Sequence, residues 1–218
     1  MRTYDDSYRH KGMRRKLVGA IREKGIYDLR VLAAMEAVPR HFFLDSAFDE
    51  LAYEDRAFPI AQEQTISQPY TVAYQTQLLE VKPYEKVLEI GTGSAYQATV
   101  LAEMGARVYT IERQRMLFDN IRKFLFLRKY PNIKFFYGDG YMGLPAYGPF
   151  DKVLITAAAP FVPQKLLDQL KPGGMMVIPY GSGATQTMKR ITKLYDGSLV
   201  AEKYDQFSFV PMLGGRHE

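Results

Sequence analysis

The residues of this chain best suited to chemistry begin with the apolar run Val87–Ile90, which ends in Gly91-Thr92-Gly93-Ser94. Glu112 follows 21 residues after Gly91, at the end of a second apolar run. Glycine lets the backbone approach a ligand closely, and a carboxylate at the next strand end can accept hydrogen bonds from both ribose hydroxyls. This spacing predicts a site for a nucleotide-like cofactor.

The turn itself narrows the choice of cofactor. A dinucleotide site would have a third glycine at the position of Tyr96, and a triphosphate loop would continue into Lys and Ser or Thr. A turn without phosphate-binding residues, followed by an acid for ribose, favours S-adenosylmethionine, which carries no phosphate. A dinucleotide site and a plain strand-to-helix turn are the alternatives.

Two other segments carry candidate residues. Asp139 follows a predicted strand and could accept a hydrogen bond from an adenine amino group, with Gly140 giving the ring access to backbone, although Asp-Gly also serves in plain turns. Ser67 stands just before Pro69, where a helix is predicted to begin. Its hydroxyl could cap that helix or act at a helix N-terminus that faces the glycine turn. The pattern alone favours the cap.

The fold that would position these residues is predicted by the alternation of strand-like and helix-like patterns along the chain. Strands are predicted near 86–91, 107–112, 133–137, 151–156 and 174–179, and helices near 94–104, 114–129 and 163–170. Such alternation predicts a doubly wound, Rossmann-like, mostly parallel α/β sheet with helices on both faces. Ligands bind outside the carboxyl ends of such strands, where the glycine turn and Glu112 fall.

The flanking regions complete the predicted architecture. Helices are expected over 7–24, from an Asp28 N-cap to Pro39, and from Pro69 to about 82, with an irregular aromatic segment over 41–59 that packs against the core. Pro172-Gly173-Gly174 predicts a tight turn, and 191–204 predict an antiparallel hairpin. We expect a single domain: residues 1–80 helical with the active-site segment, 81–180 the cofactor-binding core, and 181–218 the hairpin and substrate loop.

Composition excludes several classes of function. The absence of cysteine rules out disulfides and thiolate catalysis, and no apolar run is long enough to cross a bilayer. His10, His41 and His217 lie far apart in sequence, so no metal site is expected. The start of the chain lacks the apolar core of a signal peptide. These features predict a cytoplasmic protein, with monomer as the default state.

The net charge of +5 raises the question of a nucleic-acid partner. The basic residues, however, occur in short scattered groups such as Arg14-Arg15-Lys16 and Arg128-Lys129, which are typical of solvated surfaces. No nucleic acid is therefore expected, and an anionic substrate would suit the charge equally well.

Several segments together make the chain recognisable. It resembles the protein-L-isoaspartate (D-aspartate) O-methyltransferase family over roughly residues 14–214. Glu63–Pro69, with Thr-Ile-Ser-Gln-Pro, is the most specific part, since many methyltransferases share the glycine turn and the acid. The other matching segments follow in family order: 34–40, 52–55, 87–94, 138–140, 150–151, 156–158, 171–174 and 209–212.

The resemblance implies transfer of a methyl group from S-adenosylmethionine to the α-carboxylate of isoaspartyl residues in damaged peptides and proteins. The products are S-adenosylhomocysteine and an ester that closes to a succinimide, which starts repair. Ser67 would be the active-site hydroxyl, and main-chain groups of Phe207, Ser208 and Phe209 would hold the peptide. The implied cofactor-binding residues are Gln64, Thr65, Ile66, Glu89, Gly91, Gly93, Glu112, Asp139, Gly140 and Gln186.

The chain departs from the family pattern at three positions. Ala95 stands where the family usually has glycine, and we expect the cofactor still to fit beside its methyl group. Phe207 stands where a smaller aliphatic residue is usual, and Ser208 where a longer one is common. A methyltransferase acting on RNA or a small molecule is the nearest alternative, and a non-catalytic adaptor on the same fold is another. The intact set of site residues argues against the adaptor.

Overall fold

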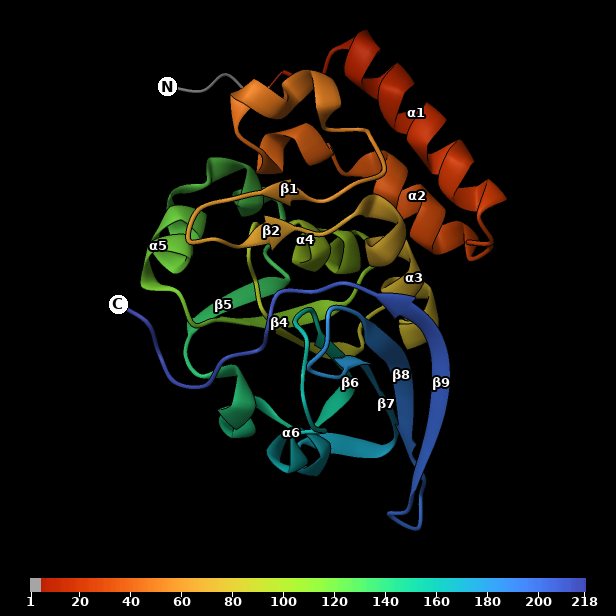
Figure 1. Cartoon of the computed structure of the whole chain (residues 1–218), viewed down its shortest axis with the longest axis vertical. Helices are drawn as coiled ribbons and strands as arrows, with labels where there is room; N and C mark the ends of the chain where they lie inside the picture. Colours follow the sequence, from red (N-terminus) through yellow and green to blue (C-terminus); the bar gives the residue numbers. More distant parts are fainter. Residues whose placement is uncertain (1–4) are drawn as a thin grey trace.

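The computed structural model describes residues 5–218, which are built on a seven-stranded sheet of order β5-β4-β3-β6-β7-β8-β9 (Figure 1). The neighbours from β5 to β7 pair in parallel, whereas β7, β8 and β9 pair antiparallel. The predicted Rossmann-like sheet with an antiparallel C-terminal hairpin is confirmed. The strands are β3 (Lys86–Ile90), β4 (Arg107–Glu112), β5 (Ile133–Tyr137), β6 (Phe150–Ile155), β7 (Leu170–Tyr180), β8 (Gln186–Lys193) and β9 (Leu199–Phe207).

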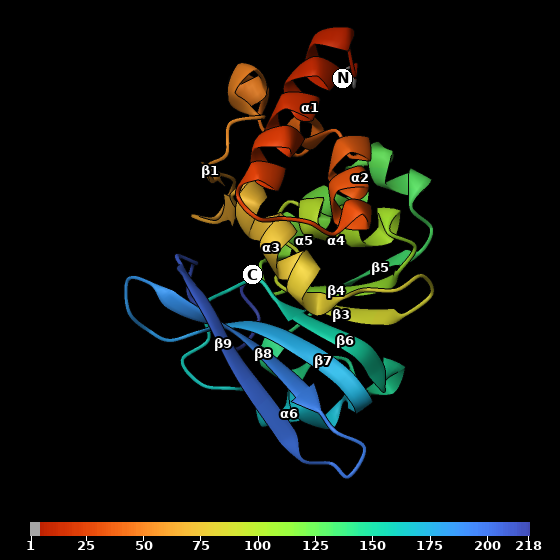
Figure 2. The same cartoon turned by 90° about the vertical axis from the view of Figure 1, so that its right-hand side faces the viewer.

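Helices cover both faces of this sheet (Figure 2). Successive strand residues point to opposite faces, so Val87 packs in one buried cluster and Leu88 in the other. Because both faces are buried, the central strands are mostly apolar, with Glu89 of β3 and Thr110 of β4 among the buried polar exceptions. Helices α3 (Pro69–Leu79), α4 (Tyr96–Glu103) and α5 (Arg115–Lys123) lie on the Val87 side, and α6 (Gln164–Asp168) lies on the other.

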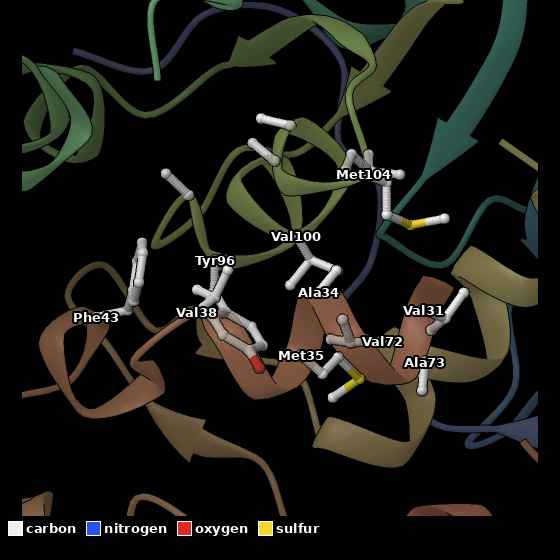
Figure 3. Packing of buried hydrophobic residues seen from close by; sticks show 14 of the residues in the cluster. Val31, Ala34, Met35, Val38, Phe43, Val72, Ala73, Tyr96, Val100 and Met104 are labelled. Carbon is white, nitrogen blue, oxygen red and sulfur yellow. The ribbon is translucent and has the colours of Figure 1, made fainter. Parts of the chain in front are cut away.

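The N-terminal region packs onto α3 and α4. In α2, Val31, Ala34 and Met35 lie in one cluster with Val100 of α4 and Val72 of α3 (Figure 3). The Asp28 side chain accepts the Arg30 N–H and caps α2, as predicted. The elements of this region are α1 (Tyr8–Glu23), α2 (Leu29–Ala37), the 3-10 turns η1 (Arg40–Phe43) and η2 (Ser46–Leu51), and the short strands β1 (Phe58–Pro59) and β2 (Thr65–Ile66).

Two sequence expectations about local structure were wrong. The helix expected over 114–129 ends at Lys123, and a 3-10 turn, η3 (Leu125–Lys129), follows an extended Phe124. The break lets the Phe124 ring pack edge-on against Phe43, at 5.3 Å between centroids. Two more 3-10 turns, η4 (Gly140–Met142) and η5 (Pro145–Tyr147), follow β5.

The second wrong expectation concerns Pro172-Gly173-Gly174. This segment is a bulge inside β7 rather than a tight turn before it: Phe150 pairs with Leu170, but Lys152 pairs with Met175. Gly173 accommodates the extra residues with a φ of +79°. Within residues 5–218, no helix combines the length and the apolar character needed to span a bilayer.

Candidate active site

A cleft lies at the carboxyl ends of β3, β4 and β6, where the sequence predicted a ligand site. Gln64–Ser67 form one wall, Gly91–Ser94 form the turn that follows β3, and Glu112–Gln114 follow β4. The site segment Gln64–Ser67, far upstream in sequence, is therefore brought against the glycine turn. Helices α3 and α4, the ends of the neighbouring strands and the C-terminal segment supply the rest: Val72, Ile90, Tyr96, Gln97, Ile111, Gly140, Thr156, Ala157 and Val210–Leu213.

Two of the three glycines that line the cleft are required by the protein's own packing. Gly91 has a φ of +98°, and a Cβ there would lie 2.6 Å from Thr156 Oγ1. That hydroxyl in turn lies within hydrogen-bond distance of the carbonyl oxygens of Ile90 and Gly91, at 2.9 and 2.8 Å. A Cβ on Gly140 would collide with the Ile90 side chain. A larger residue at either position would have to push Thr156 or Ile90, which line the cleft, out of place.

Glu112 serves the turn as well as the cleft. Its side chain is buried, with Oε2 accepting the Gly93 N–H at 2.9 Å and Oε1 accepting the Gln114 N–H at 2.8 Å. Burial raises the pKa of the Glu112 carboxyl, while the two backbone N–H groups oppose that rise. Each carboxylate oxygen has a second lone pair. The residue can therefore hold the turn and accept hydrogen bonds from a ligand diol.

Ser67 is not the cap of the helix that follows it. Gln68 is the N-cap residue of α3, and no side chain of the cap position bonds to the first turn. Ser67 is half-buried and lines the cleft, and its hydroxyl has no hydrogen-bond partner within residues 5–218. The capping interpretation, which the local pattern favoured, was wrong. The hydroxyl is left to act in the cleft.

Glu89 lies beneath the glycine turn and is not among the residues that line the cleft. It is fully buried on β3, where its Oε2 accepts a hydrogen bond from Thr110 Oγ1 at 2.5 Å and its Oε1 has no partner. Thr110 also bonds to Thr92 of the turn, at 2.7 Å. Burial raises the pKa of the Glu89 carboxyl to about 8. The contact of Glu89 with the cofactor stays a prediction.

The remaining predicted residues also lie outside the lining of the cleft. Asp139 Oδ1 accepts the Tyr141 N–H and caps η4. Gln186 is buried, with its Nε2 donating to the Gly183 carbonyl and its Oε1 accepting the Phe209 N–H at 2.9 Å. Gln186 thus fixes the loop that leads into the lining segment Val210–Leu213. The roles of Asp139, Gln186, Phe207, Ser208 and Phe209 in binding remain predictions.

Sequence reasoning missed two buried glutamines of the cleft. Gln97 and Gln114 both line it, and the Oε1 atom of each is buried without a hydrogen-bond partner. Nothing in their spacing marks them, because Gln97 occupies an ordinary helical position and Gln114 follows Glu112 in a loop. The C-terminal lining segment Val210–Leu213 was missed as well, because the predicted substrate-binding residues stop at Phe209.

Two histidines that are far apart in sequence, His10 and His41, lie side by side in the structure. The rings of His10 and His41 stack with centroids 3.9 Å apart, and potential ligand atoms of both lie within 4.8 Å of Asp6. These groups already have other partners: His10 bonds Asp49, His41 bonds Tyr53, and Asp6 pairs with Arg14 at 2.9 Å. The cluster ties the start of the chain to the N-terminal helices. The absence of a metal stays a prediction.

The fold and the site together define a class. A mostly parallel sheet with a glycine turn after one strand and a buried acid after the next is an α/β protein built to bind a nucleoside-containing cofactor. Residues 12–217 match the protein-L-isoaspartate(D-aspartate) O-methyltransferase family.

Individual relatives agree with this match. The chain is 56% identical to a protein-L-isoaspartate O-methyltransferase of Cytophaga hutchinsonii, over 96% of this chain and 95% of that one. It is 51% identical to the protein of that name from Christiangramia forsetii, over 95% and 97% of the two chains. The chain belongs to the protein-L-isoaspartate (D-aspartate) O-methyltransferase family, and its reaction is methyl transfer to isoaspartyl residues.

A solved structure is similar as well. It is described as a protein-L-isoaspartate O-methyltransferase from Plasmodium falciparum in complex with S-adenosyl-L-homocysteine. It is 26% identical, covers 92% of this chain and 98% of its own, and superposes with a TM-score of 0.79.

Proposed function

We propose that the cleft binds S-adenosylmethionine and that Ser67 orients the α-carboxylate of an isoaspartyl residue, in a damaged peptide or protein, for methylation. The observation that carries this proposal is the position of Ser67. Its hydroxyl has no partner within residues 5–218, and it lines the same cleft as the glycine turn and Glu112. A side chain that merely capped α3 would not be free to bind a substrate.

The cleft suits a nucleoside without phosphates. Glu112 offers acceptor lone pairs for ribose hydroxyls, and Gly140 lets the Ile90 and Met212 side chains pack closely against the backbone that follows β5. The orphaned oxygens of Gln97 and Gln114 offer further acceptors. Arg113 is the single Lys or Arg side chain among the lining residues of the described chain, so there is no basic cluster for a pyrophosphate.

The residues of the cleft have little acid–base work to do. A peptide α-carboxylate has an ordinary pKa of roughly 3 to 4 and is ionised at neutral pH. No histidine, lysine or aspartate lines the cleft within residues 5–218, which suits a nucleophile that needs no general base. S-adenosylmethionine supplies the methyl group, whose carbon bonds to the carboxylate oxygen as the bond to sulfur breaks and its electron pair stays on sulfur.

The protein's remaining task is to align a carboxylate oxygen of the substrate with the methyl carbon of the cofactor. The Ser67 hydroxyl can donate to one carboxylate oxygen, which leaves the other to meet the methyl carbon. The apolar lining from Val72, Ile90 and Met212 keeps bulk water away from the anion. The methyl ester leaves the enzyme, and the next backbone amide of the peptide closes the succinimide without a catalyst.

The finer expectations stay predictions: a cytoplasmic monomer that takes no nucleic-acid partner and binds the peptide along Phe207–Phe209. The strand β9 ends at Phe207 on the edge of the sheet, and an extended peptide can add to such an edge.

The decisive experiment uses two peptides that differ only in carrying isoaspartyl or normal aspartyl at one site. We expect methyl label from S-adenosylmethionine to appear on the isoaspartyl peptide alone and to be released by base as methanol. Ser67→Ala is the matched control and should lose most of this label. Label on neither peptide, with intact cofactor binding, would contradict the proposal and direct the search to RNA or small molecules.

A further inference from the structure

Gln97 occupies the first turn of α4, where its side chain lines the cleft together with Ser67 and Val72. The residue is only 8% exposed, and its Oε1 is buried without a hydrogen-bond partner. Buried acceptors without partners are rare, because each has lost its hydrogen bonds to water and has gained none within the protein. Because the residue lines a binding cleft, we look to a bound ligand for the donor that this oxygen lacks.

The orientation of this carboxamide is fixed by its neighbours on α3. Thr76 Oγ1 donates its single hydrogen to the Val72 carbonyl at 2.7 Å. The hydroxyl can then only accept, so the group that faces it at 3.0 Å must be the Nε2 of Gln97. The Oε1 is therefore held on the opposite side of the carboxamide, away from Thr76.

Gln97 and Glu112 belong to different sides of the cleft. Helix α3, which anchors Gln97, packs against β6 and β7, and Gln75 of α3 donates to the Ile155 carbonyl at the end of β6. Glu112 ends β4, which lies on the other side of β3 from β6. Helix α4, which carries Gln97, packs against β4 and β5, but the Gln97 side chain reaches toward α3 through Thr76. Gln97 therefore stands on the α3 side of the cleft, whereas Glu112 and Gln114 follow β4.

We propose that Gln97 Oε1 accepts a hydrogen bond from the α-ammonium group of S-adenosylmethionine, an inference that rests on the proposed cofactor site. With the ribose at Glu112, the amino acid portion of the cofactor has the α3 side of the cleft left to occupy, where Val72 and Gln97 lie. A carboxamide oxygen needs a donor, and in that portion only the ammonium carries N–H bonds. Glu112 is the single acid among the lining residues of the described chain, so no carboxylate competes for this role.

The test is calorimetric binding of two probes to the wild type and to Gln97→Met. S-adenosylhomocysteine carries the ammonium, whereas 5′-methylthioadenosine lacks the whole amino acid portion. We expect the substitution to raise the Kd for S-adenosylhomocysteine by about tenfold or more, the loss expected for a charge-assisted hydrogen bond. The Kd for 5′-methylthioadenosine should stay within about twofold, since its contacts are unchanged.

Gln114→Met is the matched control, because it removes the other orphaned oxygen, which belongs to the segment after β4. It should leave the ratio of the two dissociation constants unchanged. Gln97→Ala gives the same comparison if methionine is not accommodated. Equal weakening of both probes by the Gln97 variants would reduce Gln97 to a structural residue and overturn the inference.

Comparing S-adenosylmethionine with S-adenosylhomocysteine distinguishes a contact to the sulfonium from a contact to the ammonium group. Weakening of S-adenosylmethionine without weakening of S-adenosylhomocysteine would place the contact at the sulfonium and overturn the assignment to the ammonium. A wild-type protein that bound neither compound would contradict the proposed cofactor site itself, which is a different outcome from a failure of Gln97.

Discussion

The Asp55 carboxylate accepts a hydrogen bond from the backbone N–H of Tyr70 at 2.8 Å, across 15 residues of chain. Tyr70 lies in the first turn of α3, where backbone N–H groups lack partners within the helix. Lys24 pairs with the other oxygen of Asp55 at 2.6 Å and holds the carboxylate in place. A distant residue thus caps the helix, and the nearby Ser67 hydroxyl stays free for the cleft.

Asp55→Ala should lower the free energy of unfolding by about 1–2 kcal/mol, because a first-turn N–H of α3 loses its partner. Urea denaturation measures the change. Ser67→Ala is the control and should cost no more than about 0.5 kcal/mol, since its hydroxyl caps nothing. Equal costs for the two variants would mean that Ser67 shares in capping the helix.

Ser67→Ala should reduce kcat for an isoaspartyl peptide by roughly tenfold or more, a loss of about 1.4 kcal/mol of transition-state stabilisation. The affinity for S-adenosylhomocysteine should change only a few-fold, because the hydroxyl serves the substrate. Steady-state kinetics and calorimetry separate the two quantities. Unchanged turnover would remove Ser67 from the reaction.

Glu112→Ala should raise the Kd for S-adenosylhomocysteine by about tenfold or more, because two hydrogen bonds to the ribose are lost together with the support of Gly93. Calorimetry checks the affinity, and a thermal melt reports how much of the loss comes from a loosened turn. Wild-type affinity in a folded variant would refute the ribose assignment.

Ala95→Gly should stabilise the protein. Ala95 is fully buried with a φ of +69°, a left-handed conformation that costs an L-residue roughly 1–2 kcal/mol, part of which the greater chain entropy of glycine offsets. We expect Tm to rise by about 2 °C. Ala98→Gly, in the regular part of α4, should lower Tm instead. A lower Tm in Ala95→Gly would show that the methyl group contributes more by packing than it costs in strain.

Stability should depend on pH through Glu89. Burial raises the pKa of its carboxyl in the folded protein to about 8, above its ordinary value of 4.5, so the folded state holds a proton that the unfolded state has released. This contribution to stability is fully present below about pH 4.5 and is lost as the pH rises toward 8. Glu89→Gln cannot ionise. Relative to this variant, the wild type should lose Tm between pH 5.5 and 8.5, and parallel curves would contradict the assignment.

Local pattern was enough to predict the sheet and to bring the glycine turn and Glu112 to the same edge of it. Strand alternation and buried apolar runs placed β3, β4 and β5 within a residue of their observed ends, because both faces of a parallel sheet demand apolar side chains. The glycine turn and Glu112 fall at neighbouring strand ends, so their meeting follows from the strand order alone. The Thr-Ile-Ser-Gln-Pro segment carried the resemblance that gave the family.

Only the tertiary structure decided what depends on contacts between distant segments. Asp55, and not Ser67, accepts the first-turn N–H of Tyr70. His10 and His41 stack although they lie 31 positions apart in sequence. The hydrogen bond from Gln97 to Thr76 points the oxygen of Gln97 away from Thr76. Each of these outcomes is a choice between hydrogen-bond or packing partners that the local sequence does not decide, and at Ser67 the local pattern favoured the wrong partner. Which partner is reached depends on how the N-terminal helices and α3 pack against the sheet, and no periodicity in the sequence encodes that packing.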